Sequence, residues 1–147
     1  MKDRPSWDDY FMRIAFTAAE RATCDRRSVG CVLVKDHQQI AMGYNGSPRK
    51  APHCDAVNHG HPEGQEVSSC RWAIHAEMNA IATAARRGAS IKGATAYITD
   101  MPCVWCYGIL VNAGIERIVA CREYKKAPDY TVVPVEIMEG RGGGWRG

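Results

Sequence analysis

The stretch ATAYITDMPCVWCYGILVNAGIERIVAC, residues 94–121, decides the fold. Its β-branched and aromatic beginning, over 94–99, predicts a strand. A helix is predicted to follow from Cys103 and to end at Gly114, because glycine is common where helices stop. The apolar run over 115–121 predicts a second strand, which completes a strand–helix–strand unit.

The rest of the chain extends this alternation in both directions. The sequence predicts a helix capped by Ser6, two strands over 29–34 and 39–44 that form a hairpin, and a helix over 76–87 that ends at Gly88. A short final strand over 131–137 contains Pro134, which favours an edge or bulge position. Together these elements predict an α/β layer fold with a mixed sheet of about five strands.

Length and composition favour one domain. The chain has 147 residues and a net charge of +3, and we expect a single domain over 1–140, a loop insertion over about 45–72 and a flexible glycine-rich tail over 141–147. No apolar run approaches the ~20 residues that cross a bilayer, and the first residues do not resemble a signal peptide. We therefore expect a soluble cytoplasmic protein, in the host cytoplasm if the source is viral. Seven cysteines in such a chain favour metal ligation over disulfides.

Two short motifs, HAE and PCVWC, carry the chemistry of the sequence. Cys103 and Cys106 share one face of a helix whose dipole stabilises their thiolates, and Pro102 suits the first turn of that helix. His75 would complete three protein ligands for zinc and leave the fourth position to water, as a catalytic site requires. Zinc lowers the pKa of such a water, so Glu77 could take its proton without binding the metal.

The order H-x-E and then P-C-x-x-C is the pattern of zinc-dependent deaminases, in which the glutamate is the general acid and base. Each half alone is a weak signal. His75 alone is more often a capping or satisfied histidine, and a lone CxxC could be a redox pair or half of a structural metal site. Both halves in this order, each at the start of a predicted helix with a strand between them, favour the deaminase interpretation.

The chain resembles the deoxycytidylate (dCMP) deaminase family over nearly its whole length. The matching segments are TCDRRSVGCVLV (23–34), GYNGSP (43–48), HAEMNAI (75–81), MPCVWC (101–106) and GIERIVACREYKK (114–126). The resemblance implies the cytidine deaminase fold, a three-layer α/β/α arrangement with a five-stranded sheet between helices, usually assembled as a hexamer. It also implies hydrolysis of dCMP to dUMP and ammonia for thymidylate synthesis, activated by dCTP and inhibited by dTTP. No nucleic-acid or membrane partner is expected.

The resemblance also implies roles for individual residues. Asn45 would hydrogen-bond the substrate sugar, the backbone of Ala76 would contact the base, and Arg86 is a candidate for the phosphate. Asn45 and Arg86 also have simpler explanations. An Asn-Gly pair favours a tight turn, and a charge at a helix end, as at Arg86, is commonly solvated. The candidates for contacts with a triphosphate effector flank the matching loops and are Arg26, Arg27 and Lys50.

The insertion raises the question of a second zinc. It has no helical or strand periodicity, and long loops of this kind are usually functional or held by something. The resemblance matches Cys24, expected at the end of the first helix, and Cys54 to ligands of a structural zinc, with Cys70 and one histidine, favoured here as His61. A closed four-ligand site would order the loop. The alternative is exposed histidines and buried thiols without a metal.

Three other functions compete with this interpretation. A tRNA adenosine deaminase shares the fold and the HAE motif, but it needs a basic RNA-binding surface and lacks a Cys/His-rich insertion. A nucleoside deaminase usually has cysteine where His75 stands. A non-catalytic zinc module for protein interactions belongs to a different class, and Glu77 argues against it because a structural site gains nothing from an acid beside its metal.

Overall fold

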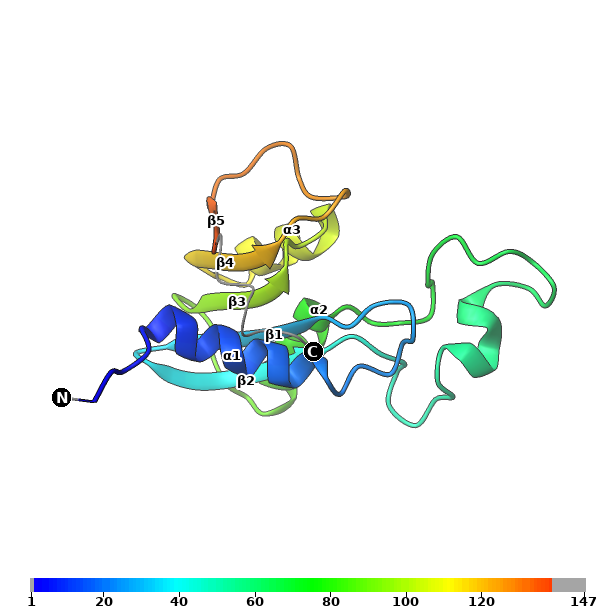
Figure 1. Cartoon of the computed structure of the whole chain (residues 1–147), viewed down its shortest axis with the longest axis horizontal. Coiled ribbons are helices and arrows are strands. Elements are labelled where there is room, and N and C mark those ends of the chain that lie inside the picture. The colour runs from blue at the N-terminus through cyan, green and yellow to red at the C-terminus, as the bar shows by residue number, and fades with distance from the viewer. Residues whose placement is uncertain (1, 139–147) are drawn as a thin grey trace.

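A five-stranded mixed sheet forms the centre of the protein (Figure 1). The computed structural model describes residues 2–138. Its elements are α1 (Trp7–Ala19), β1 (Gly30–Lys35), β2 (Gln38–Tyr44), a short 3-10 helix η1 (Asp55–Gly60), α2 (Ala76–Arg86), β3 (Thr95–Asp100), α3 (Val104–Asn112), β4 (Arg117–Arg122) and β5 (Val135–Ile137). The predicted tail over 141–147 lies outside the described residues.

The strand order is β2-β1-β3-β4-β5. β1 pairs antiparallel with both β2 and β3, whereas β3–β4 and β4–β5 are parallel pairs. The predicted hairpin and the predicted mixed sheet of five strands are therefore confirmed. The final strand is shorter than the predicted 131–137: β5 begins after Pro134 and lies at the edge of the sheet.

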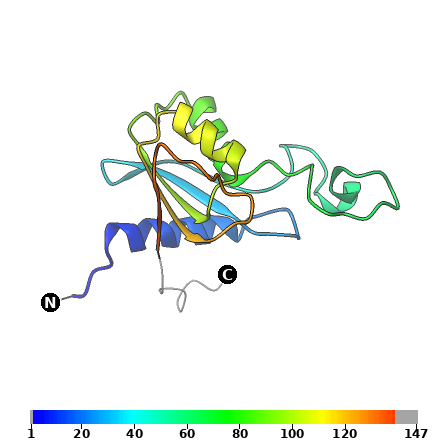
Figure 2. The ribbon, with the colours of Figure 1, turned by 90° about the horizontal axis from the view of Figure 1, so that it is seen from above.

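Helices cover both faces of the sheet, which confirms the three-layer arrangement. Figure 2 shows α1 on one face and α2 and α3 on the other. Alternate residues of β1 point to opposite faces, as in any strand. Val32 and Val34 pack in one hydrophobic core cluster with Phe11 and Met12 of α1. Leu33 belongs to the other hydrophobic core cluster, together with residues of α2 and α3. No helix within 2–138 is both long enough and apolar enough to cross a bilayer.

The first helix begins as predicted and ends earlier. The hydroxyl of Ser6 accepts a hydrogen bond from the backbone N–H of Asp9 over 3.1 Å, which caps the helix. The helix stops at Ala19, because the chain then turns and the N–H of Thr23 donates to the carbonyl of Asn45. The expectation that Cys24 ends this helix is wrong: Cys24 lies in the segment between α1 and β1.

Close packing against β2 fixes the start of α2. A Cβ atom at Gly43 would lie 2.4 Å from both the Ala76 carbonyl oxygen and the Ala80 nitrogen, so only glycine allows this approach. The side-chain amide of Asn79 donates to the Tyr44 carbonyl over 2.8 Å. The residue before the helix, His75, is therefore held at a defined place at the end of the sheet.

The insertion leaves and rejoins the fold at one point. Gly46 and Ile74 form an antiparallel bridge, with N–H to O distances of 3.1 and 2.8 Å. Between them the chain projects away from the sheet (Figure 1). The sequence predicts no regular structure here, but the insertion contains η1, in which Asn58 and His59 adopt left-handed backbone angles, with φ of 46° and 53°.

Candidate metal centre and active site

Two helix N-termini bring a histidine and two cysteines together. His75 is the N-cap of α2 and Cys103 is the N-cap of α3. The Nδ1 atom of His75 lies 3.6 Å from the Sγ of Cys103 and 3.4 Å from the Sγ of Cys106. One imidazole nitrogen and two sulfurs at this spacing fit zinc, which favours nitrogen and thiolate ligands. Pro102 precedes the cap and so lies just outside the helical turn where it was expected.

The surroundings of the two thiols favour a negative charge. Hydrogen bonding with Cys106, together with the contact to His75, lowers the pKa of the Cys103 thiol to about 4. The same hydrogen bond raises the pKa of the Cys106 thiol. A divalent cation bound here would displace any thiol proton, as metal binding to thiols generally does.

Glu77 lies beside these three residues and lines the same cavity. It is the second residue of α2 and its side chain is only 4% exposed. Burial raises the pKa of the Glu77 carboxyl, which brings it closer to neutrality. A buried carboxyl of this kind suits a group that must both accept and donate a proton.

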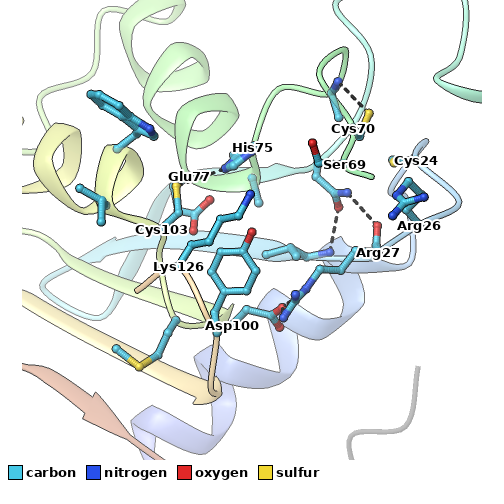
Figure 3. A pocket seen from close by; sticks show the side chains of 18 of the residues that line it. Cys24, Arg26, Arg27, Ser69, Cys70, His75, Glu77, Asp100, Cys103 and Lys126 are labelled. Atoms are coloured by element: carbon cyan, nitrogen blue, oxygen red, sulfur yellow. Dashed lines mark hydrogen bonds and ion pairs between the residues drawn. The ribbon is translucent and has the colours of Figure 1, made fainter. Parts of the chain in front are cut away.

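The cavity that holds this site has a volume of about 600 Å³. Figure 3 shows His75, Glu77 and Cys103 on one side of it and Arg26 and Arg27 on the other. Lys126 lines it as well. The cavity therefore pairs a side that carries zinc-type ligands and a buried carboxyl with a cationic side.

A buried carboxylate organises the cationic side. Asp100, which ends β3 and is 3% exposed, accepts hydrogen bonds from Arg27 Nε over 2.5 Å and from Arg122 Nε over 2.6 Å. Two guanidinium groups therefore compensate one carboxylate. The guanidinium of Arg27 also lies 4.6 Å from the centre of the Tyr124 ring. This arrangement fixes Arg27 while leaving the wall positively charged.

The residues predicted to contact substrate have different outcomes. Asn45 and Ala76 both line the cavity. The amide of Asn45 donates to the Arg27 carbonyl over 2.7 Å and accepts from the Val29 N–H over 2.8 Å, so it also holds the adjacent segment in place. Arg86 does not line the cavity: it is exposed at the far end of α2 from His75, so this cavity gives no support to the phosphate prediction for it.

The structure does not bring the three effector candidates together. Arg26 and Arg27 line the cavity described above. Lys50 lies outside that lining, exposed in a turn with φ of 65°. Contacts of Arg26, Arg27 and Lys50 with a triphosphate effector stay a prediction.

A second group of possible metal ligands lies at the base of the insertion. Its members are Cys24, Cys54, His59 and Cys70, whose ligand atoms lie within 4.8 Å of one another. We call this set the second cluster. Burial raises the pKa of the Cys54 thiol to about 11. Burial opposes ionisation of Cys70, but hydrogen bonds from the Ala73 N–H and the His59 ring lower its pKa to about 7. Three sulfurs and one nitrogen form a donor set typical of structural zinc.

His59, and not the predicted His61, belongs to the second cluster. The Nε2 atom of His61 lies 2.7 Å from the carbonyl oxygen of Ser69, so its ring is used within the insertion. Left-handed angles at Asn58 and His59 turn the chain so that the His59 ring meets Cys24, with 3.8 Å between Nδ1 and Sγ. The sequence places both histidines in the same loop and carries no signal that separates them.

Sequence reasoning also missed Asp100, Tyr124 and Lys126. Asp100 directly precedes the MPCVWC segment, and the other two lie within the segment over 114–126 that carries the resemblance. Their place in the cavity follows from the way β3 and β4 end side by side, with Asp100 paired to Arg122. A register of this kind is not readable from either strand alone.

Comparison with known proteins identifies close relatives. Residues 5–122 match the family described as "Cytidine and deoxycytidylate deaminase zinc-binding region". The deoxycytidylate deaminase of Mycobacterium phage D29 is 39% identical over 127 residues, which cover 82% of this chain and 98% of that protein. The deoxycytidylate deaminase of Saccharomyces cerevisiae is also 39% identical over 127 residues, which cover 83% of this chain.

The relatives differ from this chain in length. The matched region is only 39% of the yeast protein and 65% of ComE operon protein 2 of Bacillus subtilis, which is 39% identical to this chain over 128 residues. Among solved structures, the dCMP deaminase of cyanophage S-TIM5 in complex with dCMP and dUMP superposes with a TM-score of 0.74 at 24% identity, over 93% of this chain and 100% of that one. At that identity the superposition shows a shared fold.

Proposed function

Because the chain belongs to the cytidine and deoxycytidylate deaminase family, we propose that it hydrolyses dCMP to dUMP and ammonia. The observation that carries the proposal is that one cavity holds both halves of the required chemistry. Its metal-binding side has His75, Cys103 and Cys106 with Glu77 next to them, and its other side is cationic. In a nucleoside monophosphate, the base would lie against the side with the zinc ligands and the phosphate against the cationic side.

The three ligands fit zinc, which supplies an activated water nucleophile at neutral pH when it is bound. Glu77 would take one proton from such a water and pass it to the ring nitrogen N3 of the cytosine. After the water oxygen had added to C4, Glu77 would deliver the second proton to the exocyclic amino group. The C4–N bond would then break, so that ammonia leaves and the uracil carbonyl remains. The raised pKa of the buried Glu77 carboxyl suits a group that carries protons in both steps.

Charge in the cavity supports a monophosphate as the substrate. Arg27 and Lys126 present cationic groups to it, and guanidinium and ammonium groups are the usual protein partners of phosphate. Asp100, the acidic residue on the cationic side of the cavity, already accepts hydrogen bonds from Arg27 and Arg122. A neutral nucleoside would leave this positive charge unused.

We also propose that the second cluster binds a structural zinc. Cys24, Cys54, His59 and Cys70 supply four ligands, which closes a tetrahedral site and leaves no position for a substrate. The donor set and the absence of a hydrophobic core in the insertion both support this role. Activation by dCTP, inhibition by dTTP and assembly into a hexamer are part of the same proposal and rest on the family resemblance.

The proposal is tested by measuring deamination of dCMP, deoxycytidine and dCTP side by side with zinc-loaded protein. The loss of cytosine absorbance and the release of ammonia are two independent readouts. We expect dCMP to have the highest kcat/KM, with a response to added dCTP and dTTP. A preference for deoxycytidine, or turnover of adenosine in a tRNA anticodon stem-loop with none of dCMP, would overturn the assignment.

A further inference from the structure

One wall of the active-site cavity is built from two segments that lie far apart in the sequence. Residues 24–27 supply Cys24, Arg26 and Arg27, and residues 68–70 supply the facing part of the wall. Each segment carries one member of the second cluster, since Cys24 begins the first and Cys70 ends the other. Two of the four members of the second cluster, Cys24 and Cys70, are therefore part of the cavity wall, as Figure 3 also shows.

Apart from the contact of the His61 ring with the Ser69 carbonyl, the segment over 68–70 depends on few other contacts. It lies outside the described helices and strands, its residues are half-buried or exposed, and neither hydrophobic core cluster of the described chain includes them. Arg26 reaches it from the other segment, with Nη1 donating to the Val67 carbonyl over 2.9 Å and Nη2 donating to the Ser68 carbonyl over 3.2 Å. Arg26 and the second cluster thus hold the two segments together.

Asp25 connects the first segment to the cluster by a separate contact. Its Oδ1 atom lies 3.2 Å from the Nε2 atom of His59, whose Nδ1 atom faces the Sγ of Cys24. A metal-binding histidine commonly gives its second nitrogen to a carboxylate, which fixes the orientation of the ring. The Asp25 side chain is 67% exposed, so it can orient His59 without being part of the core.

We propose that the second cluster, oriented by Asp25, positions Arg26 and the 68–70 segment, so that its occupancy by zinc sets the affinity for the anionic substrate. The inference rests on the proposed deamination of dCMP. His75, Glu77, Cys103 and Cys106 are positioned by α2 and α3, which belong to the hydrophobic core and do not depend on this wall. Loosening the wall therefore raises KM and leaves kcat unchanged. Asp25 and Arg26 act as positioning residues in this scheme.

The test compares Asp25→Asn with Asp55→Asn, an exposed acid of the same insertion for which the structure describes no hydrogen bond or ion pair. Zinc retained after dialysis against a mild chelator is measured by elemental analysis. Cleavage by a glutamate-specific protease after the exposed residues Glu63 and Glu66 reports order in the insertion. Steady-state kinetics give KM and kcat separately for each substrate, and dCMP differs from deoxycytidine by the phosphate alone. Arg26→Gln is measured in the same way.

We expect Asp25→Asn to keep one zinc, to weaken the other about 10-fold or more, and to be cleaved faster. Its KM for dCMP should rise about 5-fold, the lower end of coupling between two sites, with kcat unchanged. Arg26→Gln should raise KM to a similar extent while keeping both zinc ions, and Asp55→Asn should match the unmodified protein.

Three results would overturn the inference. Asp25→Asn could retain both zinc ions, it could lose zinc without a change in KM, or its kcat could fall by as large a factor as its KM rises. Failure of the proposed function looks different, because the unmodified protein would then show no turnover of dCMP. In that case zinc retention and protease cleavage in Asp25→Asn still decide whether the cluster orders the wall.

Discussion

The Nδ1 atom of His75 lies 3.4 Å from the Sγ atom of Cys106, although the two residues are 31 positions apart in the chain. The contact exists because α2 and α3 begin at the same end of the sheet and each presents its first residues to the cavity. His75 is the N-cap of α2 and has an extended backbone, so its side chain and that of Glu77, the second residue of the helix, can both line the cavity. The candidate ligands and the buried carboxyl therefore all come from two helix starts.

Replacing Glu77 by glutamine should separate binding from catalysis. The amide keeps the shape of the side chain but cannot carry a proton, so we expect kcat to fall by about 100- to 10,000-fold. Zinc content and the melting temperature should stay close to those of the unmodified protein, because Glu77 is not a ligand. Turnover that survives the substitution would remove Glu77 from the mechanism.

The two histidines of the insertion provide a matched pair for the second cluster. We expect about two zinc ions per chain in the unmodified protein and about one in His59→Ala or Cys54→Ser, since both residues belong to the four-ligand set. His61→Ala should keep both, because its ring contacts the Ser69 carbonyl. Elemental analysis measures the ratio. One zinc in the unmodified protein would rule out the second site.

Lys126 tests the role of positive charge in the cavity. It lines the cavity, whereas its exposed neighbour Lys125 does not, so Lys125→Gln is a control with the same change in net charge. Lys126→Gln should raise the KM for dCMP about 10-fold, the value of a lost hydrogen bond to a charged group, and leave deoxycytidine unaffected. Equal effects of the two substitutions would point to the general field of the protein instead of a phosphate contact.

The ion pair between Asp8 and Arg117 should make stability depend on acid pH. The Asp8 carboxylate accepts from Arg117 Nη1 and Nη2, each over 2.8 Å, and from the Tyr97 hydroxyl over 2.7 Å. The hydrogen bond from Arg117 holds the pKa of Asp8 below its ordinary value of 3.8. A carboxyl whose folded pKa is lowered stabilises the protein above its unfolded pKa and loses that contribution as the pH falls through the folded pKa.

Asp8→Asn should therefore lower the free energy of unfolding by about 1 kcal/mol at pH 7, an estimate kept small because both side chains are about one-third exposed. The difference from the unmodified protein should shrink towards pH 2. Urea unfolding at the two pH values measures it, and a difference independent of pH would exclude the electrostatic explanation.

Two glycines should respond oppositely to alanine. A Cβ atom at Gly43 would lie 2.4 Å from backbone atoms of α2, so Gly43→Ala should lower the free energy of unfolding by about 3 kcal/mol and shift the start of the helix. Gly108 lies within α3 with open space around it, and Gly108→Ala should stabilise the protein by about 0.5–1 kcal/mol through helix propensity. Thermal unfolding of both variants measures the contrast.

Local pattern was enough to predict the sheet, the helices and the first metal centre. His75, Cys103 and Cys106 each lie at a helix start that capping and the spacing of apolar residues reveal, so their approach follows once the sheet closes. The end of α1 was missed because it depends on the hydrogen bond from Thr23 to Asn45, a contact with a distant segment.

The other differences between expectation and structure have a similar origin. Choosing His59 over His61 requires the left-handed backbone at Asn58 and His59, which no periodic pattern announces. Arg86 looked suitable by its place on the helix that carries Glu77, but an 11-residue helix puts its last residue about 15 Å from its first. Direction along the helix, which spacing alone ignores, excludes it from the cavity.

The bridge between Gly46 and Ile74 has a consequence for how this architecture can change over generations. Because the insertion enters and leaves through that single pair, its length and content can be exchanged without altering the register of β2 or the position of α2. Cys54, His59 and Cys70 all lie inside it. A descendant that deleted the loop would lose three ligands of the second cluster in one event and still inherit His75, Cys103 and Cys106, so the two metal sites can evolve as separate units.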